Sequence, residues 1–83
     1  MIRAIGVLES SSISMGIEAT DTMLKSGSVQ LLESKPVCPG KYITIIYGDV
    51  GSVESSMATG KQVLDSFYVD ELLIPNVSPQ VVQ

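Results

Sequence analysis

A β-hairpin is encoded by residues 35–48, KPVCPGKYITIIYG, and this hairpin sets how the rest of the chain is arranged. Residues 42–48 are rich in β-branched and aromatic side chains, which favour a strand. Residues 29–37 form its partner strand, which ends or runs along a sheet edge at Pro36 because proline cannot donate to a ladder. The four residues Cys38-Pro39-Gly40-Lys41 form the turn, since proline presets φ and glycine tolerates positive φ. The pattern predicts a tight hairpin with the cysteine at its tip.

A strand and a helix are predicted before the hairpin. Residues 2–9 are apolar at successive positions, which is typical of a central strand, and Gly6 within them indicates a close approach by a helix. Serines 10–12 supply an N-cap for a helix over residues 12–26. The helical spacing of Ile13, Ile17, Thr20 and Leu24 predicts its apolar face, with Gly16 and Ala19 beside it allowing close packing.

A second helix and a last strand are predicted after the hairpin. Asp49 is a suitable N-cap for a helix over residues 50–66, and residues 68–74 read as a strand closed by Pro75. The helix keeps one apolar face through Val50, Val53, Met57, Gly60, Leu64 and Phe67. The order β-α-β-β-α-β predicts an α+β, ferredoxin-like fold, in which a four-stranded antiparallel sheet carries both helices on one face.

The 83 residues are predicted to form one domain, with a core over residues 2–75 and a short C-terminal tail over 76–83. Apolar residues make up 45% of the chain and charged residues only 17%, which is a large apolar share for a body of this size. A compact monomer with a rich core would account for it. A homo-oligomer accounts for it better, because subunits bury surface that a monomer would expose.

Several classes of partner are disfavoured by composition. The formal net charge is -4, and five basic residues form no patch for binding nucleic acid. No apolar run reaches the ~18 residues of a membrane span. The N-terminus lacks the regions of a signal peptide, so we expect a cytoplasmic protein without a membrane partner.

Catalysis is also disfavoured. The chain has no histidine, which removes the Ser-His-Asp and Cys-His mechanisms. Its nine carboxylates are scattered, and Asp49 is already explained as a helix cap. We therefore expect a protein that is not an enzyme.

Cys38 is the residue that stands out. A lone cysteine is usually a small buried hydrophobe, but this one lies in a proline–glycine turn. One thiol per chain cannot hold a metal cluster. A ring that brings several copies of the turn to its symmetry axis would converge several thiolates, and three of them could ligate three irons of a four-iron cluster.

Three stretches resemble a known family, the bacterial microcompartment shell domain. They are residues 4–9 (AIGVLE), residues 21–26 (DTMLKS) leading into Val29, and Gly48-Asp49-Val50 at the start of the second helix. The resemblance covers residues 2 to about 75. It implies a domain that forms six-sided tiles, which pack edge to edge with other shell proteins into a compartment shell.

Residues 35–41 resemble the first half of tandem-domain members of that family from propanediol-utilisation compartments. This resemblance implies a pore loop of Val37, Cys38, Pro39 and Gly40, and a tile-edge contact through Lys25. In such members three two-domain chains form a pseudohexamer, and the cysteine that Cys38 matches binds a 4Fe-4S iron–sulfur cluster on the three-fold axis.

Two departures leave alternatives open. The chain ends where a second domain would begin, and Pro75-Asn76-Val77 stands where single-domain members have a proline-arginine-proline turn. The chain is therefore either half of a tandem protein, acting as a trimer, or a single-domain tile, acting as a hexamer with six cysteines around its axis. Two other functions also remain open: an electron-transfer module, and a small-molecule-binding regulatory domain of ferredoxin-like fold.

Overall fold

The computed structural model describes residues 3–26 and 28–75. The elements are β1 (Arg3–Ser10), α1 (Ile13–Ser26), β2 (Gln30–Val37), β3 (Lys41–Asp49), α2 (Val50–Leu64), a 3₁₀ turn η1 (Asp65–Phe67) and β4 (Tyr68–Pro75). This order confirms the predicted β-α-β-β-α-β arrangement. The tail predicted over residues 76–83 lies outside the described residues.

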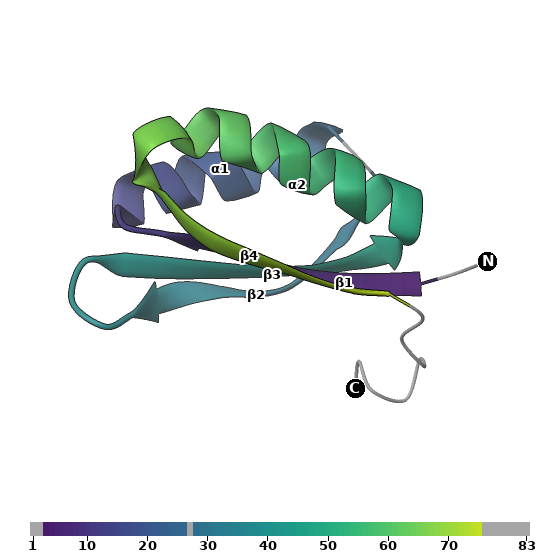
Figure 1. Ribbon diagram of the computed structural model, residues 1–83, viewed down its shortest axis with the longest axis horizontal. Coiled ribbons are helices and arrows are strands. Elements are labelled where there is room, and N and C mark those ends of the chain that lie inside the picture. The colour runs from purple at the N-terminus through teal and green to yellow at the C-terminus, as the bar shows by residue number, and fades with distance from the viewer. Residues whose placement is uncertain (1–2, 27, 76–83) are drawn as a thin grey trace.

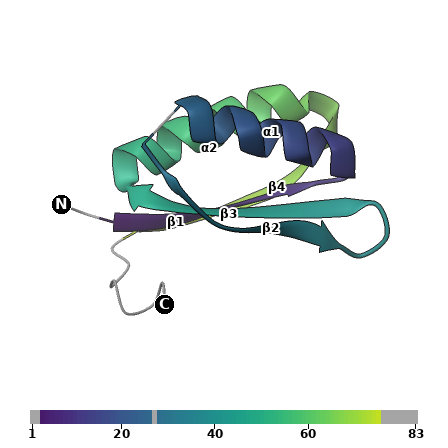
Figure 2. The ribbon, with the colours of Figure 1, turned by 180° about the vertical axis from the view of Figure 1, so that it is seen from behind.

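The four strands form one sheet in the order β2-β3-β1-β4, with every neighbouring pair antiparallel. Both helices lie on the same face, and the described residues leave the other face of the sheet uncovered (Figures 1 and 2). β1 is central, as its continuous apolar pattern predicted, and β2 with its Pro36 is an edge strand, also as predicted. The ferredoxin-like topology is therefore confirmed.

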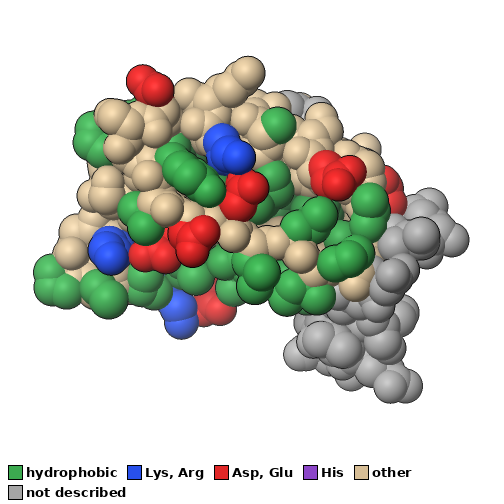
Figure 3. Space-filling view, in the orientation of Figure 1, with side chains coloured by type: hydrophobic (Ala, Val, Ile, Leu, Met, Phe, Trp, Pro, Cys, Tyr) green, Lys and Arg blue, Asp and Glu red, His purple; other side chains and the backbone are tan. Residues whose placement is uncertain are grey.

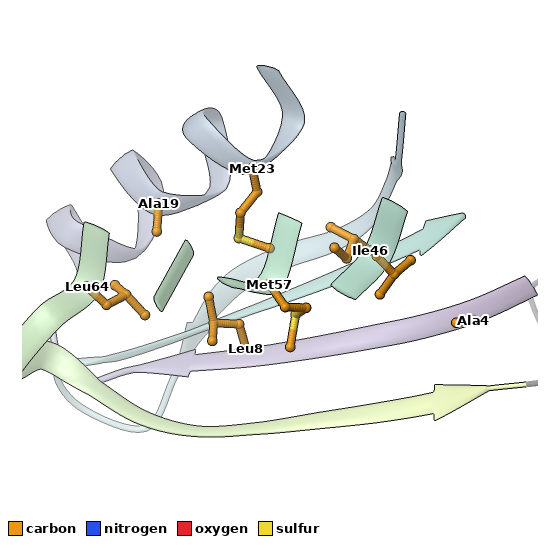
Figure 4. Packing of buried hydrophobic residues seen from close by; sticks show 8 residues of the cluster. Ala4, Leu8, Ala19, Met23, Ile46, Met57 and Leu64 are labelled. Carbon is orange, nitrogen blue, oxygen red and sulfur yellow. The ribbon is translucent and has the colours of Figure 1, made fainter. Parts of the chain in front are cut away.

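The core lies between the helices and the sheet, where alternate strand residues meet the two helices (Figure 4). On the strands, Ala4, Leu8 and Ile46 are almost fully buried. Gly6 allows α2 to approach β1, because a Cβ at this position would lie 2.8 Å from Cγ1 of Val53. The intervening strand residues point to the uncovered face, which holds part of the apolar surplus as half-buried side chains.

The buried face of α1 differs from the predicted one. Ile13 and Ile17 are 37% and 53% exposed, whereas the buried positions are Gly16, Ala19, Thr20 and Met23. Small side chains bring the helix close to the sheet: a Cβ on Gly16 would lie 2.8 Å from Cβ of Tyr42. The predicted stripe was therefore wrong for Ile13 and Ile17, whereas Leu24 is half-buried. Thr20 is buried, and its hydroxyl lies 2.7 Å from that of Thr44 on β3.

Both helix starts are capped as predicted. The backbone N–H of Met15 donates to the hydroxyl of Ser12 (3.2 Å), and that of Ser52 donates to Oδ1 of Asp49 (2.9 Å). These bonds from the backbone and hydroxyl of Ser52 hold the pKa of the Asp49 carboxyl below its ordinary value, because they favour the charged form. Asp49 is therefore committed to the helix cap.

The predicted face of α2 is buried at Val53, Met57, Gly60 and Leu64. The prediction was wrong for Phe67, which is 41% exposed. The reason is that the α-helix ends at Leu64, and Asp65 turns the chain with a φ of 50° into the 3₁₀ turn, so Phe67 no longer follows the helical repeat.

Candidate functional site

The tip of the β2–β3 hairpin is a three-residue loop, Cys38 to Gly40, between the paired residues Val37 and Lys41. The backbone N–H of Lys41 donates to the carbonyl oxygen of Cys38 (3.4 Å), and Gly40 has a φ of 80°. Proline at the second position and glycine with positive φ at the third are the pattern of a type II turn. The predicted turn chemistry is therefore confirmed.

Cys38 is exposed at the tip of this loop. The reading of a buried apolar cysteine is thus excluded. Its φ of 58° lies in the left-handed region, which costs a residue with a Cβ roughly 1–2 kcal/mol relative to glycine. Glycine would be less strained at this position, but the residue there is Cys38. Its side chain is exposed to solvent.

Two lysines flank residues 37–40, the predicted pore loop, and both are paired. Nζ of Lys35 lies 3.1 Å from Oε2 of Glu33, and Nζ of Lys41 lies 3.7 Å from Oε2 of Glu9. These pairs are partly exposed and contribute at most ~1 kcal/mol each. Because of these two ion pairs, charges of both signs lie beside the loop.

Lys25 lies at the opposite end of the molecule from the loop. It is in the last turn of α1, whereas the hairpin tip lies near the first turn (Figures 1 and 2). Its Nζ is 2.9 Å from Oδ2 of Asp21, the i,i+4 pair that helical spacing favours. The side chain is 75% exposed and free to contact a neighbouring molecule. The fold therefore separates the predicted pore residue and the predicted edge residue.

A groove of about 230 Å³ between α2 and β4 was not predicted from the sequence. Met57, Ala58 and Leu73 give it apolar walls, and an ion pair between Lys61 and Glu71 (3.2 Å) lies at its border. These residues come from separate elements, and no sequence motif joins them. Two carboxylates, Glu54 and Glu71, line the groove, and the second of them is the one paired with Lys61; the lining residues include no serine, cysteine or histidine.

Within residues 3–26 and 28–75, no group of three or more His, Cys, Asp or Glu side chains is placed to hold a metal ion. One copy of the described chain thus offers a single thiol, and a cluster on Cys38 requires several copies. In the same part of the chain, no helix has the length and apolar character needed to cross a membrane.

The chain with this fold belongs to a defined class of protein. Residues 4–77 match the family model described as the BMC domain. Because the match spans most of the 83 residues, the chain belongs to the BMC domain family. The resemblance to bacterial microcompartment shell domains noted from the sequence is thereby confirmed.

Two relatives show which kind of BMC-domain protein this chain is similar to. The chain is 48% identical over 81 residues to the bacterial microcompartment shell protein PduT of Citrobacter freundii, covering 98% of this chain and 44% of PduT. It is 35% identical over 57 residues to the bacterial microcompartment shell protein PduA of Salmonella typhimurium, covering 69% of this chain and 61% of PduA. Both relatives are named as shell proteins, not as enzymes.

A solved structure confirms the fold. The crystal structure of a microcompartment protein from Desulfitobacterium hafniense superimposes with a TM-score of 0.94 at 51% identity, covering 99% of this chain and 46% of that one. The chain therefore spans less than half the length of PduT and of this solved protein.

Proposed function

We propose that this chain is a structural tile of a bacterial microcompartment shell. The observation that carries the proposal is the match of residues 4–77 to the BMC domain, supported by the names of PduT and PduA. The large hydrophobic side chains left exposed on the described residues suit a structural role in an assembly. The tile would form from six copies of one domain or three copies of a two-domain protein.

Assembly tests this proposal. We expect sedimentation analysis of the purified chain to give a mass several times the 8.8 kDa of one copy, and electron microscopy to show flat sheets or tubes at higher concentration. Other shell proteins of the same compartment should co-assemble with it. A monomer at micromolar concentration that does not associate with those proteins would contradict the shell role.

A more specific proposal concerns the pore loop. Residues 37–40 would surround the symmetry axis of the tile, where they control passage or hold a redox centre. The exposure of Cys38 and its left-handed backbone support the second role, because strained backbone is retained where the side chain serves a purpose. Three copies of Cys38 would ligate three irons of a 4Fe-4S cluster and leave the fourth iron for a non-protein ligand.

Anaerobic reconstitution with ferrous iron and sulfide tests the cluster. The wild-type chain should acquire visible absorbance and bind up to about four irons per three chains, and Cys38→Ser should lose both. As a matched control, Cys38→Ser combined with Ser55→Cys keeps one thiol per chain but moves it to an exposed position on α2. This variant should bind no cluster. Equal spectra for the wild type and Cys38→Ser would overturn the cluster and leave the shell role standing.

A further inference from the structure

The turn between α2 and β4 contains an aspartate with a strained backbone. Among residues 3–26 and 28–75, the residues other than glycine that have a positive φ are Cys38 and Asp65. Cys38 belongs to the predicted pore loop, whereas Asp65 ends α2 and has no part in the proposed tile or its pore. Its φ of 50° and ψ of -116° are close to those of the first central residue of a type II′ turn, where glycine is usual. An aspartate therefore stands where glycine would be less strained.

Contacts on both sides of Asp65 hold the turn in this conformation. On the helix side, Leu64 is fully buried in the core. On the strand side, the backbone N–H of Tyr68 donates to the carbonyl oxygen of Asp65, and that of Ser11 donates to the carbonyl oxygen of Phe67 (2.8 Å). Strained backbone persists where the surrounding structure fixes it in this way.

The strained conformation places the next backbone nitrogen beside the Asp65 side chain. A ψ of -116° turns the nitrogen of Ser66 to the same side of the Cα–C bond as Cβ of Asp65, so that these two atoms nearly eclipse each other. The same eclipsed arrangement exists in a cyclic imide that joins the Ser66 nitrogen to Cγ of Asp65. An aspartate in an α-helix or a strand must rotate about ψ before such a ring can close, and Asp65 needs almost no rotation.

The residue after Asp65 is small. The chain has four aspartates, and the other three precede the bulkier residues Thr22, Val50 and Glu71. Attack by a backbone nitrogen is hindered by a large or branched side chain on the same residue. Ser66 hinders it least, so the most favourable neighbour occurs at the aspartate that also has the favourable ψ.

The turn lies on the surface of the molecule. It joins the end of α2 to the start of β4 at one end of the fold (Figure 1), and Figure 3 shows that polar and hydrophobic side chains lie together on the surface at this end. Asp65 and Ser66 are both exposed. Water, which the opening of an imide consumes, therefore reaches the turn.

We propose that Asp65 is a site of spontaneous isomerisation to isoaspartate. The Ser66 nitrogen forms a bond with Cγ of Asp65, the bond between Cγ and its hydroxyl oxygen breaks, and one water leaves with the amide proton. Water then adds to one of the two carbonyl groups of the imide, which gives either aspartate or isoaspartate. One water is lost and one is gained, so the reaction needs only solvent.

Isoaspartate would lengthen the chain between α2 and β4. The backbone then runs through Cβ and Cγ of residue 65, which adds one methylene, and the former carbonyl group becomes a free carboxylate. The hydrogen bond from Tyr68 to that carbonyl has to be remade. The β1–β4 register already shifts between Glu9 and Ser10, beside the start of β4, so the strand can adjust there. We therefore expect the isomerised chain to stay folded.

Ageing of the purified chain tests the proposal. Trypsin cuts after Lys61 and leaves residues 62–83 as one peptide, in which the aspartate and isoaspartate forms separate by chromatography and differ in electron-transfer fragmentation. After several weeks at neutral pH, we expect isoaspartate at Asp65. We expect none at Asp21, an exposed aspartate in α1 whose carboxyl pairs with Lys25 (2.9 Å).

The folded turn should be the cause of the reaction. We expect isoaspartate to form at Asp65 about 10-fold faster in the folded chain than in guanidinium chloride, because unfolding frees ψ from its strained value. Ser66→Val places a branched side chain beside the attacking nitrogen and should slow the reaction at least ~10-fold. Ser55→Val makes the same change at an exposed position on α2 and should leave the rate unchanged. Circular dichroism would show that both variants are folded.

Three results would each overturn the inference. They are no more isoaspartate at Asp65 than at Asp21, equal rates in the folded and the unfolded chain, and equal rates in Ser66→Val and Ser55→Val. The comparison in guanidinium chloride needs no variant, so it decides the matter even if Ser66→Val does not fold. The proposed tile is tested separately: a wild type that stays monomeric but forms isoaspartate at Asp65 would contradict the tile and leave this inference standing.

Discussion

Gly16→Ala is expected to lower the free energy of unfolding by about 1–3 kcal/mol, although alanine is normally the better residue in a helix by roughly 0.5–1 kcal/mol. A Cβ at this position would lie 2.6 Å from Cδ2 and 2.8 Å from Cβ of Tyr42. Tyr42 cannot turn away easily, because its own Cβ is fixed to β3 and its hydroxyl donates to Oγ of Ser34 (2.8 Å). α1 would have to move away from the sheet.

Gly51→Ala is the matched control for this prediction. It lies in the first turn of α2, is exposed, and a Cβ there would meet nothing closer than Oδ1 of Asp49 at 3.5 Å. This variant should gain up to ~1 kcal/mol, the usual advantage of alanine over glycine. Urea unfolding of both variants at one chain concentration measures the two effects. Changes of the same sign at both glycines would contradict the tight packing of Gly16 on Tyr42.

Most of the fold was predictable because its signals are local. The Cys38–Lys41 turn leads into a strand rich in β-branched and aromatic residues, and Asp49 caps the helix that follows. Gly6 in a strand indicated a close approach by a helix, and α2 makes that approach through Val53. Each of these features depends on residues that are close in sequence or on a rule that needs no knowledge of the partner.

The buried face of α1 was not predictable in the same way. Gly16, Ala19, Thr20 and Met23 repeat with helical spacing, and so does the bulkier set that includes Ile13 and Ile17. Periodicity cannot choose between two such faces, and hydrophobicity favours the bulkier one. The fold buries the small side chains instead because α1 lies close against Tyr42. Ile13 and Ile17 are left exposed.

The candidate site was also predictable only in part. The position of Cys38 in the loop was evident from the neighbouring proline and glycine. Its left-handed backbone was not, since cysteine has no preference for that region. Any cluster on Cys38 depends on the number of copies around an axis. That number is a property of the assembly and cannot be predicted from the local sequence.

Ile46→Ala is expected to lower the free energy of unfolding by about 2–5 kcal/mol. Ile46 is fully buried on β3, in the cluster that also contains Met23 and Met57. Removing three carbons there loses transfer free energy and leaves a cavity that the helices cannot fill completely. A domain of this length has a total stability of only about 4–12 kcal/mol. The variant should therefore melt at least ~10 °C below the wild type.

Ile45→Ala removes the same atoms one residue away and should cost only about 1 kcal/mol in the monomer. Ile45 is half-buried beside Val7 on the uncovered face, because successive strand residues point to opposite faces. Thermal unfolding over a range of chain concentrations measures both variants. The cost of Ile46→Ala should not change with concentration, since that side chain is enclosed within one copy. If assembly also covers the open face of the sheet, the cost of Ile45→Ala should grow as assembly proceeds. Equal costs in the monomer would mean that the two faces are equally buried within a single chain, against the arrangement of helices on one face alone.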